Sequence, residues 1–276
     1  MSWLDRLGRT LGVRRPATPA RIRATALDRR QIGLAVAVLV VAVPLALMLA
    51  VDQSVAIAFR DGSPGFRNAM EAVTRFGESQ WVLVPSAVVA LSAFVAASRE
   101  PQPLRRSALR WIGQTNLFVF VVVALSGIGV NVIKVIIGRA RPRVFFGDGF
   151  FGVDPLTFGS AYASFPSGHT ATAFAFAIAV GMIARRTRPF LFAFAALIAL
   201  SRVAITAHWV GDTVAAAGLA LVIALCVRHW FATRGLAFTI RADGQTVLTP
   251  SGRLVLAAAR RLLKRHQLHD RPERTA

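Results

Sequence analysis

Long apolar runs separated by short polar loops are the dominant pattern of this sequence. Six runs are candidates for helices that cross a bilayer: residues 32–51, 81–97, 111–137, 166–184, 189–204 and 208–230. A spanning helix needs about 20 mostly apolar residues. The strictly uncharged parts of the last three runs are shorter than this, and they reach that length only if the polar residues at their ends extend the helices at one membrane surface. The pattern predicts an all-α membrane protein of six transmembrane helices.

The charge of the loops predicts the side of the membrane that each one occupies. Arginine is concentrated in the N-terminal segment, in residues 99–110, in residues 185–188 and in the C-terminal segment. Cytoplasmic loops are rich in Lys and Arg, so six spans place these four segments, and both termini, in the cytoplasm. Residues 52–79, 138–165 and 205–212 then face outward.

Three regions follow from this pattern. Residues 1–31 form a basic cytoplasmic segment, residues 32–232 the six-span domain, and residues 233–276 a basic cytoplasmic tail. Apolar residues at helical spacing in both basic segments are compatible with a helix on the membrane surface or with a solvated segment. A similar pattern in the first outer loop predicts a surface helix over residues 66–76.

Composition agrees with a membrane protein and argues against other classes. Hydrophobic residues make up 55% of the chain, which is too apolar for a single soluble domain of this size. The net charge of +20 would suit a nucleic-acid-binding protein. The arginines follow the membrane flanks instead, and no recognition motif is present, so no nucleic-acid partner is expected.

One outer loop breaks the charge rule. Arg139, Arg141 and Arg143 place three positive charges on the side that should carry few. They follow Lys134, near the end of the third run, in the stretch KVIIGRARP. Anion binding is one reason to keep cations at this position.

Two later stretches place reactive side chains on the same outer face. PSGH, Pro166–His169, begins the fourth span, and SRVAITAHWVGD, Ser201–Asp212, joins the fifth span to the sixth. Arg202 can bind a phosphate through paired hydrogen bonds, and His208 can attack phosphorus or move protons. If a helix begins at His208, Asp212 lies one turn later on the same face, where its carboxylate can hold one ring nitrogen.

Each stretch also has a simpler interpretation. Arg202 can be an arginine that extends to the membrane surface, Ser167 an ordinary helix N-cap and His169 a surface histidine. The combination is the stronger argument, because ionisable residues at membrane depth are costly and tend to be functional.

Together the three stretches resemble the type 2 phosphatidic acid phosphatase superfamily, which includes bacterial nonspecific acid phosphatases and vanadium haloperoxidases. Its pattern is KxxxxxxRP, then PSGH, then SRxxxxxHxxxD, and this chain has every signature residue in order between Lys134 and Asp212. The six-span plan extends the resemblance to about residues 30–232. The resemblance implies an acid phosphatase/vanadium haloperoxidase-like bundle of helices three to six.

The resemblance also implies a role for each signature residue. His208 would be the nucleophile that forms a phosphohistidine, Asp212 would orient its ring, and His169 would act as general acid and then as base. The phosphoryl oxygens would be bound by Lys134, Arg141, Arg202, Ser167 and the backbone N–H of Gly168. Two histidines would also suit zinc, but the usual third ligand is missing, so neither a metal nor a cofactor is expected.

The expected function is metal-independent hydrolysis of a lipid phosphate or diphosphate at the periplasmic face of a bacterial inner membrane. A phosphotransferase that uses the same site and a non-catalytic lipid carrier are the alternatives. The expected partners are membrane lipids and an amphiphilic phospholipid or polyprenyl phosphate substrate. Similar enzymes act on undecaprenyl diphosphate, phosphatidylglycerol phosphate, phosphatidic acid or lipid A phosphates. The motifs bind the shared phosphoryl group, so they favour the polyprenyl diphosphate only slightly over lipid A 1-phosphate.

Overall fold

The computed structural model describes residues 41–242 and 244–249, most of them helical. Among these residues, one compact unit contains residues 41–88 and 117–228, and a second contains residues 89–116 and those from 229 onward. Residues 1–40 and 250–276 lie outside the described part of the chain. They include the start of the first predicted span and most of the two basic segments in which we considered surface helices.

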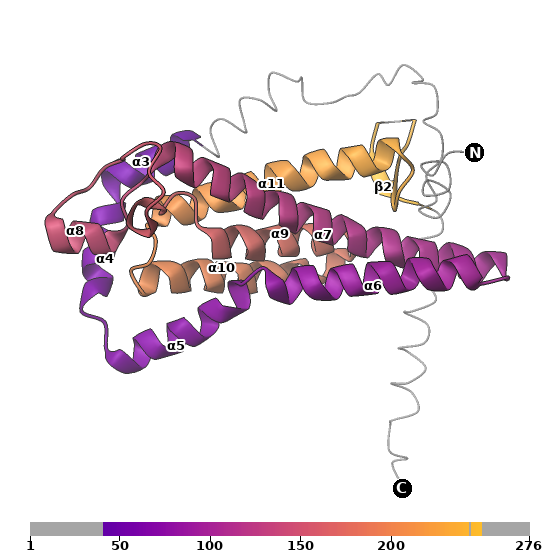
Figure 1. Ribbon diagram of the computed structural model, residues 1–276, viewed down its shortest axis with the longest axis horizontal. Coiled ribbons are helices and arrows are strands. Elements are labelled where there is room, and N and C mark those ends of the chain that lie inside the picture. The colour runs from indigo at the N-terminus through magenta and orange to yellow at the C-terminus, as the bar shows by residue number, and fades with distance from the viewer. Residues whose placement is uncertain (1–40, 243, 250–276) are drawn as a thin grey trace, which may run out of the picture. The chain divides into compact units, whose positions relative to one another are not determined.

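The described elements are numbered as in Figure 1. The α-helices are α3 (Val43–Ala50), α4 (Asp52–Arg60), α5 (Pro64–Thr74), α6 (Gln80–Arg99), α7 (Pro103–Ile137), α8 (Pro142–Asp148), α9 (Gly168–Ile183), α10 (Arg188–Ala204) and α11 (Val210–Thr233). Three 3₁₀ turns, η2 (Arg75–Gly77), η3 (Ser160–Tyr162) and η4 (Arg185–Thr187), and two strands, β1 (Phe238–Ile240) and β2 (Thr246–Leu248), complete them.

Helix α4 lies where the sequence predicted a loop. We expected a helix to end at residue 51 with a loop after it, but the chain bends by 55° and α4 begins directly at Asp52. Val51 separates the two helices, with a φ of −127° that lies outside the helical range. Pro44 is at the start of α3, where its missing N–H leaves no hydrogen bond unmade. The bend is therefore at Val51, and the next residue, Asp52, is buried.

The helix predicted for the first outer loop is present as α5. Ser63 caps it, because the hydroxyl of Ser63 accepts a hydrogen bond from the N–H of Phe66 (3.4 Å). Pro64 occupies the first turn, where proline is favoured. Helix α5 lies beside α10 (Figure 1) and contacts it.

The later helices follow the predicted spans, apart from the start of α7. Helix α7 begins at Pro103, well before residue 111, because the helix continues through the basic residues that we had assigned to a loop. Helix α9 has 16 residues and begins at Gly168. Helices α6, α10 and α11 agree with the predicted runs to within a few residues.

The described helices are compatible with six spans. Four segments are long and apolar enough to cross a membrane: Pro64–Arg99, Pro103–Ile137, Arg185–Ala204 and Val210–Thr233. The bent pair α3–α4 adds a fifth if it forms one broken span, and α9 is shorter than the others. The number of spans and their orientation remain predictions.

Helices α9 and α10 pack side by side through small residues (Figure 1). Ala173 and Ala177 of α9 belong to one buried cluster with Ala195 and Ile198 of α10. Small side chains let helix backbones approach closely. The N-terminal end of α9 and the C-terminal end of α10 are held in place by this packing.

The connection from α7 to α9 is a folded segment that carries α8. Gly138 has a φ of +60°, a left-handed conformation that favours glycine, and a side chain there would overlap the carbonyl of Asp154. The N–H of Ala140 donates to the carbonyl of Gly152 (3.0 Å). These contacts hold the residues after Gly138 at the end of α7.

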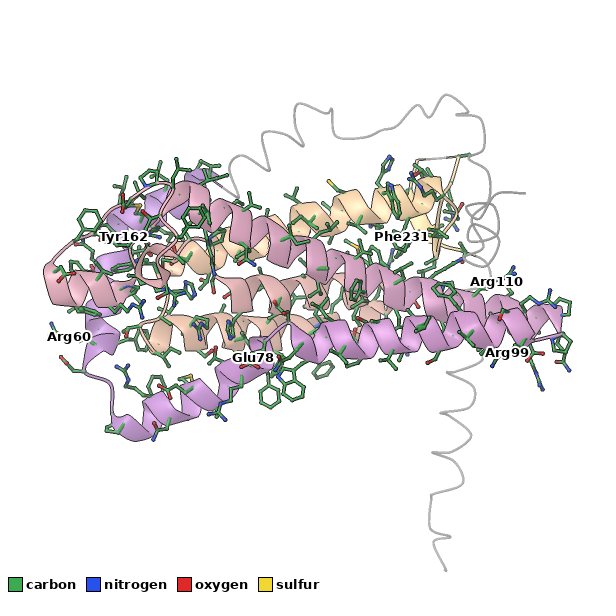
Figure 2. The ribbon with its side chains drawn as sticks, viewed as in Figure 1. Arg60, Glu78, Arg99, Arg110, Tyr162 and Phe231 are labelled. Carbon is green, nitrogen blue, oxygen red and sulfur yellow. The ribbon has the colours of Figure 1, made fainter. Side chains whose placement is uncertain are left out.

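Helix α4 also contacts this connection. Arg60, labelled in Figure 2, ends α4, and its guanidinium lies 5.1 Å from the centre of the Phe146 ring of α8. Tyr162, also labelled there, lies in η3 and contacts Phe150. These aromatic contacts connect the loop to itself and to α4.

The second unit contains a β-hairpin that the sequence did not predict. Strands β1 and β2 pair antiparallel, with Phe238 opposite Leu248. The N–H of Ala237, just before β1, donates to the side-chain carbonyl of Gln114 in α7 (2.8 Å). The strands are only three residues long each, which leaves too little alternation for a sequence pattern to reveal.

Candidate active site

Three segments of the first unit meet in one place: the end of α7 and the loop after it, the start of α9, and the loop that leads into α11. The N–H of Ser164 donates to the carbonyl of Arg139, and the N–H of Ser167 donates to the carbonyl of Asp212, both at 3.1 Å. The ammonium of Lys134 lies beside Gly168, 3.6 Å from the position that a Cβ would take. The structure therefore brings residues of all three sequence motifs together.

Asp212 is buried at the third position of α11. Its Oδ2 accepts a hydrogen bond from the N–H of Trp209, the residue before the helix (3.0 Å). Such a bond satisfies one of the N–H groups that every helix start leaves unpaired. The start of α11 thus fixes the carboxylate, and His208, two residues before the helix, lies beside it.

His208 is buried next to this carboxylate. Its Nδ1 lies 3.5 Å from Oδ2 of Asp212, and its backbone N–H donates to the carbonyl of Arg202 (3.2 Å). Burial lowers the pKa of the His208 imidazole to about 4, although the Asp212 carboxylate acts in the opposite direction. The ring is therefore neutral near pH 7, and a nitrogen without a proton is the form that can attack phosphorus.

Three half-buried cations lie near the two histidines: Lys134, Arg141 and Arg202. In the part of the chain that the structure describes, none of them forms an ion pair with a carboxylate. Arg141 donates to the carbonyl of Ala163 (3.3 Å), and Arg202 donates to the hydroxyl of Thr74 (3.0 Å). These bonds orient the guanidiniums without neutralising them. An anion placed among the three cations would relieve their mutual repulsion.

The start of α9 supplies His169, Gly168 and Ser167. The backbone at Gly77 approaches His169 so closely that a side chain at position 77 would collide with it. The hydroxyl of Ser167 accepts a hydrogen bond from the hydroxyl of Thr170 (3.0 Å) and makes no capping bond to α9. Ser167 therefore is not an ordinary side-chain N-cap, and its hydroxyl hydrogen is able to donate elsewhere.

The three outer arginines have different environments. Arg139 is buried against two carboxylates, whereas Arg143 is exposed and donates to the hydroxyl of Ser160 (2.9 Å). Only Arg141 belongs to the cation group near the histidines. Our expectation that the outer charges bind an external anion is therefore wrong for Arg139, because its anions are side chains of the protein itself.

Sequence analysis missed two residues of this site, Asp52 and Ser164, and gave Arg139 no partner. Ser164 donates to Oδ2 of Asp212 (2.5 Å), and Arg139 joins Asp212 to Asp52. Removing one partner of a buried ion pair typically costs about 3–5 kcal/mol. Asp52 could have been recognised as a candidate, because it is an acidic residue directly after an apolar run. The sequence around Ser164 contains nothing that indicates its contact with Asp212.

Comparison with known proteins identifies the family. The sequence model of the PAP2 superfamily matches residues 116–236, which include all three motifs. A lipid A 1-phosphatase from Rhizobium johnstonii is 30% identical over 174 residues, which cover 63% of this chain and 71% of that protein. The chain belongs to the PAP2 superfamily. A lipid A 1-phosphatase from Rhizobium etli is 29% identical over 174 residues and is matched over 75% of its length.

A solved structure of this superfamily has the same fold. It is the transmembrane PAP2-type phosphatidylglycerolphosphate phosphatase from Bacillus subtilis, with a TM-score of 0.53 and 19% identity over 74% of this chain and 96% of that chain. The resemblance that we drew from the motifs is confirmed, as is the expected all-α membrane fold. The protein is a multi-pass membrane phosphatase of the PAP2 superfamily.

Proposed function

We propose that this PAP2 protein hydrolyses a lipid phosphate or diphosphate through a phosphohistidine on His208. One observation carries the proposal: a buried, neutral histidine lies against a fixed carboxylate, beside three cations that have no carboxylate partner among the described residues. A phosphoryl group supplies the missing negative charge and a phosphorus atom for the histidine to attack.

In the first step, Nε2 of His208 attacks phosphorus and forms the P–N bond as the P–O bond to the lipid breaks. The leaving oxygen takes its proton from His169, so the lipid departs as a neutral alcohol or, from a diphosphate, as the monophosphate. The Nδ1 proton of His208 faces Asp212, whose negative charge stabilises the imidazolium that forms.

In the second step, the same groups hydrolyse the intermediate. His169, now without its proton, takes one from a water molecule, and the water oxygen attacks phosphorus. The P–N bond breaks, its electron pair returns to Nε2 of His208, and orthophosphate leaves. His169 is then protonated and His208 neutral, as at the start, so the cycle balances without a metal or cofactor.

The remaining residues bind the transferred group. Lys134, Arg141 and Arg202 surround the phosphoryl oxygens with positive charge, which matters most as charge spreads over them in the transition state. Ser167 and the N–H of Gly168 add hydrogen bonds at the start of α9, where the helix dipole also favours an anion.

An apolar groove supports a lipid as the substrate. It has a volume of about 550 Å³ and lies between α9, α10 and α11. Its lining includes Phe174, five residues after His169, and Thr213, directly after Asp212. One end is therefore near the level of the catalytic groups, where the tail of an amphiphile can lie while its phosphate reaches the cations.

The curated relatives change which lipid we test first. Both act on lipid A at its 1-phosphate, according to their names, so we place lipid A 1-phosphate ahead of the polyprenyl diphosphate that the motifs had slightly favoured. The charge of the loops supports an active site on the periplasmic face of a bacterial inner membrane.

Phosphate release by the purified protein across a panel of lipids tests this proposal. The panel contains lipid A 1-phosphate, undecaprenyl diphosphate, phosphatidylglycerol phosphate and phosphatidic acid, with a sugar phosphate as the water-soluble control. We expect hydrolysis of at least one lipid in the presence of EDTA and its loss in His208→Ala. Preference for the sugar phosphate over every lipid would contradict the proposed substrate class. Transfer of the phosphoryl group to an added acceptor lipid instead of water would favour the phosphotransferase.

A further inference from the structure

The guanidinium of Arg139 lies between two buried carboxylates. Its NH1 is 2.6 Å from Oδ1 of Asp212, and its NH2 is 2.7 Å from Oδ2 of Asp52. The three side chains are at most 3% exposed. Asp52 is the first residue of α4 and is far from the three family motifs along the sequence. Arg139 nevertheless joins it to the Asp212 carboxylate, because it forms an ion pair with both.

Each oxygen of the two carboxylates has a donor. The second oxygen of Asp52, Oδ1, accepts from the N–H of Gly211 in the first turn of α11 (2.9 Å). The second oxygen of Asp212 accepts from Ser164 and from the N–H of Trp209. Buried charges are tolerated when they are paired and hydrogen-bonded. Both carboxylates meet this condition, whereas Nε of Arg139 has no partner among the described residues.

Aromatic rings close the space around Arg139. Its guanidinium carbon lies 5.6 Å from the centre of the Phe151 ring and 5.4 Å from that of Trp209. The indole N–H of Trp209 donates to the carbonyl of Ala140 (2.7 Å). The segment between His208 and Asp212 is thus held to the loop that carries Arg139.

Asp52 reaches the catalytic pair by two routes. Through Arg139 it fixes one oxygen of Asp212, and through Gly211 it fixes the backbone immediately before Asp212. Asp52 is almost fully buried, whereas Lys134, Arg141 and His169 are only partly buried. Asp52 is therefore placed to affect how the Asp212 carboxylate meets His208, and among the described residues it makes no hydrogen bond to the three cations.

We propose that Asp52 and Arg139 are positioning residues, which hold the Asp212 carboxylate against Nδ1 of His208 and couple the bend between α3 and α4 to catalysis. The inference rests on the proposed role of His208. It predicts that loss of the pair slows the chemical step and leaves phosphate binding unchanged.

The first test is Asp52→Asn in the purified full-length protein, assayed with phosphatidic acid or lipid A 1-phosphate in mixed micelles, whichever the wild type hydrolyses faster. We expect kcat to fall by about 10- to 100-fold, by analogy with the loss of residues that orient metal-ligating histidines. The KM and the inhibition constant for orthophosphate should stay at the wild-type values. Asp61→Asn is the matched control, because Asp61 is an exposed carboxylate just after the same helix.

The second test separates positioning from stability. Arg139→Met leaves two buried carboxylates without their partner, so we expect both a lower Tm and a lower kcat. Combining it with Asp52→Asn removes one of these charges, which should raise the Tm above that of Arg139→Met while kcat stays low. If kcat recovers together with the Tm, the pair has only a structural role and the proposal is wrong.

The two proposals fail in different ways. If Asp52→Asn is fully active and has the wild-type Tm, while His208→Ala is inactive, only the positioning role is overturned. Activity of His208→Ala at the wild-type rate would overturn the phosphohistidine mechanism on which this inference depends.

Discussion

Nδ1 of His208 lies 3.5 Å from Oδ2 of Asp212, four residues later, and both side chains are buried. At this separation Nδ1 forms no hydrogen bond to the residues that the structure describes, and catalytic hydrogen bonds are often long without substrate and shorten when it binds. Because the carboxylate faces Nδ1, the other ring nitrogen is the one available to attack.

Asp212→Asn should reduce kcat strongly. An amide cannot stabilise the imidazolium and can hold the wrong tautomer of His208, an effect that costs about 10⁴-fold in a serine protease triad. We expect a loss of roughly 10²- to 10⁴-fold here, with little change in the inhibition constant for orthophosphate. A variant that keeps more than half of the wild-type kcat would contradict the orienting role of Asp212.

The acidic limb of the pH profile should lie unusually low. His208 attacks only when it is neutral, and burial lowers its pKa from 6.5 to about 4, so protonation should abolish kcat/KM only as the pH falls through about 4. Burial and the neighbouring cations also lower the pKa of His169 to about 4 in the free protein. A bound phosphoryl anion favours the protonated form, so the alkaline limb from His169 should be read from kcat, which reports the complex. The measurement is kcat/KM against pH, corrected for ionisation of the substrate phosphate. An acidic limb near 6.5 would contradict a buried, neutral His208.

Substitution of Arg141 and of Arg143 should distinguish the contribution of phosphate binding from that of general positive charge. Arg141→Met removes a cation of the proposed phosphate site and should raise the inhibition constant for orthophosphate by about 10- to 100-fold, since a hydrogen bond to a charged group contributes about 1.5–3 kcal/mol. Arg143→Met removes the same charge two residues away, from an exposed side chain. This variant should leave the inhibition constant for orthophosphate unchanged. Equal effects of the two variants would mean that only the general positive charge matters.

Blocking the apolar groove should affect lipids and spare soluble substrates. Ala196 lines the groove on α10, and Ala193 is an exposed residue of the same helix outside the lining. Ala196→Trp should lower kcat/KM for the lipid by about tenfold or more and leave hydrolysis of p-nitrophenyl phosphate unchanged. Ala193→Trp is the control. Equal loss on both substrates with Ala196→Trp would show that the groove does not hold the lipid tail.

The helices could largely be predicted because hydrophobic runs are a local signal. The errors occurred where charge was used as a boundary. Helix α7 continues through basic residues from Pro103, and α4 begins at Asp52, which resembled the first residue of a loop. A charge interrupts a hydrophobic run without ending a helix, so composition placed these boundaries wrongly.

The motif residues that the structure brings together could be listed from the sequence. The residues that hold Asp212 in place could not. Arg139 and Asp52 are 87 residues apart along the chain, and their ion pair exists only because the α3–α4 bend lies against the start of α11. Ser164 contacts Asp212 over a separation of 48 residues. Contacts of this kind depend on tertiary packing, and no spacing rule within one segment reveals them.

Rapid-quench labelling tests the central claim most directly. The wild type and His208→Ala are mixed with a lipid whose phosphate carries ³²P, stopped in alkaline detergent within one turnover, and digested for peptide mapping. We predict an acid-labile, alkali-stable label on the peptide that contains His208, and no label on the variant. A phosphoryl group on a different side chain, or unlabelled His208→Ala that still releases phosphate at the wild-type rate, would contradict the phosphohistidine mechanism.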